Sequence, residues 1–124
     1  MDLTVDLAWL LEIARTQLGD PDVTDWGALE AARARHAFRV MGEPVYLRPH
    51  HRAAALFQSL VRIPALEHSN QFFGAAVAVG YLTASGLPVR FTAKEAADLA
   101  EQVAAQPMDI RTLANALKEW TERS

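Results

Sequence analysis

The sequence predicts an all-α protein, a bundle of about six helices around a central apolar helix, with one short extended flap. Three observations support this fold class. Apolar residues recur at three- and four-residue spacing along several segments, as on one face of an α-helix. Residues suited to cap helices precede several of these segments. About half of the 124 residues are apolar, so one core and a single domain over residues 1–124 are expected.

The first two helices precede the flap. Apolar residues form one stripe along residues 3–18, which predicts a first helix that ends at Gly19. Asp25 is suited to cap a second helix over residues 26–36. The following stretch, RVMGEPVYLRP, contains Gly and Pro, which break helices, and VYL, which favours an extended conformation. This stretch is therefore the expected flap.

A short polar loop joins the third and fourth helices. The third is expected over residues 50–62 and is stopped by Pro64. The fourth is expected over residues 70–86, with Ser69 as its N-cap and Gly86 as its C-cap signal. It lacks a polar face and consists mostly of small residues, so it belongs in the middle of the bundle. The residues expected in close helix contacts are Gly74, Ala76, Ala78 and Gly80.

The last two helices begin at recognisable caps. Thr92 and Glu95 form a capping-box pattern, which predicts the start of the fifth helix. The segment before it, GLPVRF, is expected to be extended. Asp109 is suited to cap the sixth helix, which carries Leu113, Leu117 and Trp120.

Composition and charge exclude several kinds of protein. The chain has no cysteine, which rules out disulfides, thiolate catalysis and cysteine-based zinc sites. Twelve basic and fifteen acidic residues are interspersed, so no basic stripe for nucleic-acid binding is present. The longest apolar run, residues 72–82, is too short to span a membrane, which takes about 20 residues. The N-terminus lacks the basic residues of a signal peptide, so a cytoplasmic location is expected.

A cluster of polar residues stands at the start of the central helix. Residues 67–71 read Glu-His-Ser-Asn-Gln and run directly into the apolar segment. The N-terminus of a helix presents unpaired N–H groups and the positive end of the helix dipole, which favour an anion. This cluster is therefore the candidate functional site.

Nearly the whole chain resembles the Doc toxins of the Fic family, the death-on-curing type. DLAWLLEIARTQLGDPDVTDWGALEAARAR resembles the two leading helices, and GEPVYLRPHHRAAALFQSLVR the flap and the helix before the motif. AAVAVGYLTASGLPV resembles the central helix, and EAADLAEQVAAQPMDIRTLANAL the closing pair. The family motif, H-P-F-x-D-G-N-K-R, aligns without a gap on PALEHSNQF, residues 64–72, in which Asn70 is retained.

The resemblance implies a role for each position of the motif. At most of these positions this chain has a different residue. The general base of the family is a histidine, and Pro64 stands in its place. The acidic residue that holds Mg²⁺ is replaced by His68, and the glycine by Ser69. The two basic residues that bind phosphate are replaced by Gln71 and Phe72.

These departures imply that nucleotide or phosphate transfer has been lost. Proline has no titratable group and cannot be a general base, a role worth about 10²–10⁴-fold in rate. Histidine is a poor ligand for Mg²⁺, which prefers oxygen. A phenylalanine in place of a cation removes the charge neutralisation on which phosphoryl transfer depends. Whether the protein is an enzyme stays open; if it is, we expect acid–base chemistry on a small molecule rather than AMP or phosphate transfer.

The first functional hypothesis is a Doc fold repurposed to bind or transform a small, largely apolar or amphipathic organic molecule in the former nucleotide cleft. His68 and Glu67 would then be the catalytic acid–base pair. The ligand would be contacted by Ser69, Asn70, Gln71 and Phe72, and from the flap by Tyr46 and Arg48. No cofactor is expected, and no metal either, because the four histidines lack the spacing of metal ligands.

The second hypothesis is a catalytically inactive toxin-like module that acts through protein contacts, with an antitoxin-like segment or a second copy of the chain. Glu67 is then a solvated loop residue and His68 a histidine at the helix terminus, and Asn70 and Gln71 cap the helix. Arg48 is then an exposed surface charge.

Overall fold

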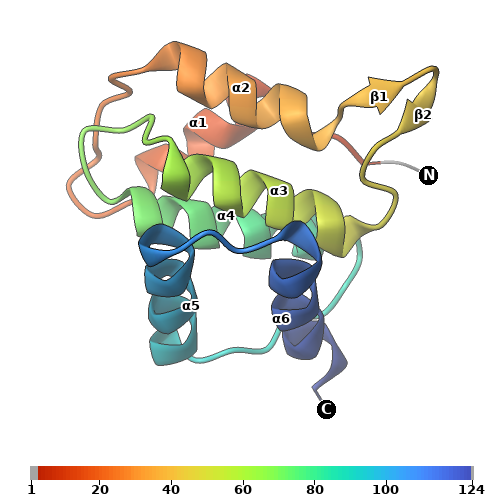
Figure 1. Ribbon diagram of the computed structural model, residues 1–124. Coiled ribbons are helices and arrows are strands. Elements are labelled where there is room, and N and C mark those ends of the chain that lie inside the picture. Colours follow the sequence, from red (N-terminus) through yellow and green to blue (C-terminus); the bar gives the residue numbers. More distant parts are fainter. Residues whose placement is uncertain (1–2, 124) are drawn as a thin grey trace.

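The computed structural model describes residues 3–123, which fold into six helices and a two-stranded hairpin (Figure 1). The elements are α1 (Leu7–Arg15), α2 (Trp26–His36), β1 (Arg39–Val40), β2 (Glu43–Pro44), α3 (Pro49–Arg62), α4 (Asn70–Ala84), α5 (Ala93–Ala105) and α6 (Ile110–Glu122). The all-α prediction is confirmed. None of the helices within residues 3–123 is long and apolar enough to cross a membrane.

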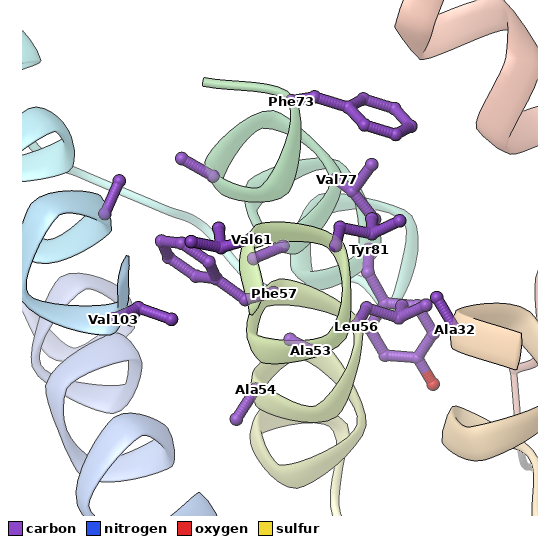
Figure 2. Close-up of a cluster of buried hydrophobic side chains, with 14 of the residues drawn as sticks. Ala32, Ala53, Ala54, Leu56, Phe57, Val61, Phe73, Val77, Tyr81 and Val103 are labelled. Atoms are coloured by element: carbon purple, nitrogen blue, oxygen red, sulfur yellow. The ribbon is translucent and has the colours of Figure 1, made fainter. Parts of the chain in front are cut away.

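The helices α3 and α4 lie together in the middle of the bundle. In Figure 1, α1 and α2 lie on one side of this pair, and α5 and α6 on the other. Figure 2 shows Leu56 and Tyr81 directed toward Ala32 of α2, and Phe57 directed toward Val103 of α5. The centre of the bundle is therefore occupied by α3 and α4 together, and not by α4 alone as predicted. Helix α3 is buried on several sides.

Gly74 of α4 allows a close approach to α3. A Cβ atom at this position would lie 2.6 Å from Cγ2 of Val61 and 3.2 Å from the carbonyl oxygen of Phe57. Real Cβ atoms essentially never come as close as the first of these distances. The absence of a side chain at Gly74 is therefore a packing requirement of the α3–α4 contact.

Two other small residues of α4 also occupy tight positions, and one does not. A Cβ at Gly80 would lie 3.3 Å from the ring of Trp9 in α1, and Ala78 is fully buried. Ala76 instead is half-buried and lines an open groove between α1, α4 and α5. Its expected place in a close helix contact is wrong, because α1 and α5 do not meet over this face of α4.

The predicted flap is confirmed, and it contains an antiparallel hairpin whose two strands precede the VYL segment. Arg39 pairs with Pro44 and Val40 with Glu43. Its turn, residues 41–42, has positive φ angles of 52° and 83°. Positive φ at both turn residues is the backbone shape that matches the twist of a two-residue hairpin.

The first helix is shorter at both ends than the apolar stripe predicts. Residues before Asp6 are held by other elements: the backbone N–H of Val5 donates to Nε2 of His36 at 3.0 Å. At the other end, the hydroxyl of Thr16 donates to the carbonyl oxygen of Ile13 at 2.7 Å. Such a side-chain bond competes with continuation of the helix.

The buried ring of His36 is expected to make stability depend on pH. Its Nε2 accepts from Val5 and its Nδ1 donates to the carbonyl of Arg33, so the ring is neutral. Burial lowers the pKa of His36 below 6.5; the hydrogen bond to the carbonyl of Arg33 opposes this shift, and the positive charges of Arg33 and Arg52 add to it. The unfolded chain therefore binds more protons than the native state once the pH falls below about 6.5, and stability declines there.

The measurement for His36 is the urea midpoint at about pH 7.5 and about pH 5.5. The parent protein should lose stability at the lower pH. The variant His36→Gln should lose less over the same interval, since its side chain does not titrate. An equal loss in both proteins would show that His36 is not the responsible group.

Candidate functional site

The loop between α3 and α4 is bound to the segment that precedes α2. The carbonyl oxygen of Ala65 accepts hydrogen bonds from the backbone N–H groups of Thr24 (2.8 Å) and Asp25 (3.1 Å). Val23 and Leu66 form an antiparallel bridge beside these bonds. The position of the motif loop is thus set by a segment more than 40 residues earlier, such as Thr24, which is 41 residues before Ala65.

Glu67 extends this contact between the two segments. Its backbone N–H donates to the carbonyl oxygen of Asp22, and its Oε1 accepts from the backbone N–H of Asp22, both at 3.0 Å. One carboxylate oxygen is therefore already engaged by the protein. Glu67 therefore holds the loop against the segment that precedes α2.

His68 lies at the surface beside Glu67. Its Nε2 is 3.8 Å from Oε1 of Glu67, and its Nδ1 is 2.8 Å from the hydroxyl of Ser69. The ring packs on Gly19, where a Cβ would lie 3.3 Å from Cε1 of His68. The structure thus brings the two expected acid–base residues together, with about half of each side chain exposed: 50% for His68 and 45% for Glu67.

Asn70 closes the loop on itself. Its Oδ1 accepts from the backbone N–H of Leu66 and its Nδ2 donates to the carbonyl oxygen of Leu66, both at 3.0 Å. The two ends of the amide are therefore used inside the loop. The one retained residue of the family motif has a structural role here.

Ser69 begins α4 in an unfavourable backbone conformation. Its φ is 67°, in the left-handed region, and its side chain makes no capping hydrogen bond to the helix. The prediction that its side chain caps the helix is therefore wrong, because the hydroxyl contacts His68 instead. The family glycine at this position would adopt the same backbone angle without strain.

Replacing Ser69 with glycine is expected to stabilise the protein by about 0.5 kcal/mol. The left-handed conformation costs an L-residue about 1–2 kcal/mol, and the extra freedom of glycine in the unfolded chain offsets about 0.5–1 kcal/mol of the gain. The control is Ser85→Gly. Ser85 has a φ of −80°, so glycine brings no relief of strain there and should lower the stability of the protein. Urea midpoints measure both changes, and a less stable Ser69→Gly variant would contradict the argument.

Phe72 lies apart from the polar cluster, on the wall of an apolar groove. Its surface is 62% exposed, whereas the neighbouring Phe73 is fully buried. The groove has a volume of about 530 Å³ and runs between α1, α4 and α5. Its lining consists of Ile13, Thr16, Phe72, Ala75, Ala76, Val79, Gly80, Phe91, Ala93 and Ala96, and residues 67–71 do not line it.

The remaining candidates do not join the loop. Gln71 is exposed on the first turn of α4. The hydroxyl of Tyr46 accepts from Nε of Arg35 at 3.2 Å, and the guanidinium lies over its ring. Arg48 lines a small pocket where α3 begins, whereas the motif loop follows the end of α3. The 14 residues of α3 separate these two ends by about 21 Å.

A larger groove, of about 810 Å³, was not predicted from the sequence. It lies between α2, α3 and the turn before α6, and its lining includes Ala28, Ala31, Arg35, Ser59 and Met108. Nη1 of Arg35 donates to the hydroxyl of Ser59 at 3.0 Å across it. The alanines of α2 carry no local signal for a groove. Within residues 3–123, no group of three or more His, Cys, Asp or Glu side chains could hold a metal ion.

Fold and site together define a small all-α protein whose motif loop precedes a central helix. No protein-family model matches the chain. The chain is similar to a protein named Toxin Doc from Mycolicibacterium smegmatis, with 38% identity over 98 residues, which are 77% of this chain and 75% of that protein. The chain belongs to the Doc toxin family, and the resemblance found in the sequence is confirmed.

Proposed function

We propose that the protein is a catalytically inactive, toxin-like member of the Doc family that acts through protein contacts, with an antitoxin-like segment as its partner. The proposal is supported by one observation: polar groups of the loop form hydrogen bonds within the protein itself. Glu67 binds the backbone of Asp22, and Asn70 binds the backbone of Leu66. With Pro64 at the base position and no acid at the metal position, the motif lacks the groups that transfer requires.

The apolar groove beside Phe72 supports the contact with a partner. An exposed phenylalanine on an apolar groove between helices is a surface that fits the apolar face of an amphipathic helix. A large aromatic residue at the edge of such a groove is also the residue type that dominates binding energy in protein interfaces. The partner is therefore expected to bury Phe72.

Loss of transfer is tested with ATP. We expect calorimetry with ATP and Mg²⁺ to detect no binding up to about 1 mM, which corresponds to about −4 kcal/mol. Incubation with labelled ATP and cell extract should label no protein. Micromolar binding of ATP, or label on any target, would overturn this half of the proposal.

The protein contact is tested by co-expression with the product of the adjacent gene. Phe72→Glu is expected to weaken the complex at least about tenfold, because it places a charge in the buried apolar contact. Gln71→Glu is the matched control, since Gln71 is exposed on the same turn of α4 and lies outside the groove. Failure to form a complex, or equal binding by both variants, would contradict the proposal.

A second candidate function is the binding of a small apolar molecule in the same groove. Its volume of about 530 Å³ and its apolar lining fit the range of about 300–1,000 Å³ for ligand pockets. His68 and Glu67 do not line the groove, which favours binding over chemical transformation. Mass spectrometry of protein purified without denaturation would favour this function if it found an apolar molecule that the Phe72→Lys variant lacks.

A further inference from the structure

A second concave site lies where α3 begins, away from the motif loop and from the apolar groove. The start of α3, the middle of α6 and the segment after α4 enclose a pocket of about 290 Å³. In Figure 1 the start of α3 and the segment that follows α4 lie near α6. The lining residues are Arg48, Pro49, His50, His51, Leu87, Ala114, Asn115 and Lys118.

Positive charge gathers at this pocket although the chain as a whole carries a net charge of −3. Arg48 comes from the N-cap of α3 and Lys118 from α6. No side chain caps the N-terminus of α3, and the positive end of the α3 dipole adds to the same field. Glu122 is the acid nearby, with its Oε1 3.7 Å from Nζ of Lys118.

The two histidines of the pocket lie among cations. Burial, followed by the charges of Lys118 and the neighbouring His51, lowers the pKa of His50, and Glu122 opposes this shift. Burial, followed by the charges of Arg48 and Arg111 of α6, lowers the pKa of His51. Both effects disfavour the protonated ring in the empty pocket, and an anion would reverse the contribution from the cations.

His51 also leaves a polar atom unused. Its Nδ1 is buried and has no hydrogen-bond partner within the protein. Nε2 of His50, by contrast, lies 2.9 Å from the hydroxyl of Thr121. Buried polar atoms in native proteins nearly always have a partner, so this nitrogen, which solvent does not reach, is an unusual unpaired group beside the pocket.

We propose that this pocket binds a small organic phosphate monoester, with its dianionic head between Arg48 and Lys118 and its organic part against Leu87 and Ala114. Two cations match the charge of a phosphoryl dianion, and Arg48 offers the forked donors that bind phosphate oxygens in pairs. Asn115 supplies an amide donor at the rim. The small volume selects a short ligand over a nucleotide.

Phenyl phosphate is the probe, titrated into the ¹⁵N-labelled protein and followed by NMR. Saturable shifts are expected at the amides of His50, Leu87 and Asn115. Binding should be several-fold tighter at about pH 6.5 than at about pH 8.5, because the bound anion favours protonated histidine and most of the phosphate is dianionic at both pH values, its second pKa being about 6. Inorganic phosphate should compete, which separates the head group from the ring as the recognised part.

Matched variants locate the site. Arg48→Gln and Lys118→Gln should each weaken binding about tenfold or more, the effect of losing a charge-assisted contact. Arg15→Gln and Lys94→Gln remove the same charges from exposed positions elsewhere and should leave binding unchanged. Glu122→Gln should tighten binding, because it removes the acid beside Lys118. His51→Gln should reduce the dependence on pH.

Shifts that do not saturate, or shifts that persist in both Arg48→Gln and Lys118→Gln, would show that no anion site exists here. Tighter binding at about pH 8.5 would contradict the role of the histidines. Arg48 and Lys118 are exposed, so their variants should fold, and equal melting temperatures would verify it.

Discussion

Replacing Gly74 with leucine is expected to lower the free energy of unfolding by about 3 kcal/mol, the upper end of the usual cost of overpacking a core. A Cβ at this position already falls 2.6 Å from Cγ2 of Val61. The side chain of Val61 can shift, but the carbonyl oxygen of Phe57, at 3.2 Å, belongs to the backbone of α3. A leucine therefore forces α3 and α4 apart along the centre of the bundle.

The control for Gly74 is Ala76→Leu, two residues further along the same helix. Ala76 is half-buried and lines the open groove, so a leucine there has room and should change stability by no more than about 0.5 kcal/mol. Chemical denaturation followed by far-UV circular dichroism measures both variants. Similar midpoints for the two would mean that the α3–α4 contact at Gly74 is looser than described.

The starts of α2, α5 and α6 could be predicted from the sequence because their signals are local. Asp25 accepts the N–H of Ala28 at 3.0 Å, and Asp109 accepts the N–H of Thr112 at 2.7 Å. Thr92 forms the expected capping box with its partner three residues later. In each case the cap and the group that it satisfies lie within three residues, so a pattern in the sequence is sufficient.

The apolar stripe alone did not give the limits of the first helix, although its start carries a local cap, Asp6, whose side chain accepts from the N–H of Trp9 at 2.9 Å. Before this cap, the N–H of Val5 bonds to His36, which is 31 residues away. The apolar stripe over residues 3–18 is real, but its first residues are buried by another part of the bundle. Periodicity alone does not distinguish these two ways of burying the same side chains.

Local patterns also predicted only part of the candidate site. The sequence placed the polar cluster correctly at the start of α4. It could not show that Glu67 bonds to Asp22, which is 45 residues earlier, or that Phe72 faces a separate groove. A polar side chain in a loop is equally suited to bind a ligand or its own backbone, and only the distant partner decides between them.

Replacing Asn70 with alanine is expected to cost about 3 kcal/mol of stability. The substitution removes both hydrogen bonds to Leu66, one to its N–H and one to its carbonyl oxygen. Leu66 is only 3% exposed, so water cannot readily replace them. Each buried group left without a partner costs about 1–3 kcal/mol. The bridge between Leu66 and Val23 should loosen as well, and the loop should become more sensitive to proteolysis.

A short series of variants separates this structural role from a role in ligand binding. Asn70→Asp keeps the oxygen that accepts from Leu66 but turns its second carboxylate oxygen toward the carbonyl oxygen of Leu66, where two acceptors repel, so it should cost at least as much as Asn70→Ala, about 3 kcal/mol. Gln71→Ala, at the exposed next position, should change stability by less than about 0.5 kcal/mol. If Asn70→Ala is no more costly than Gln71→Ala, the amide is not committed to the loop. The polar cluster would then be available to a ligand, and chemistry at His68 and Glu67 would again become the better explanation of this site.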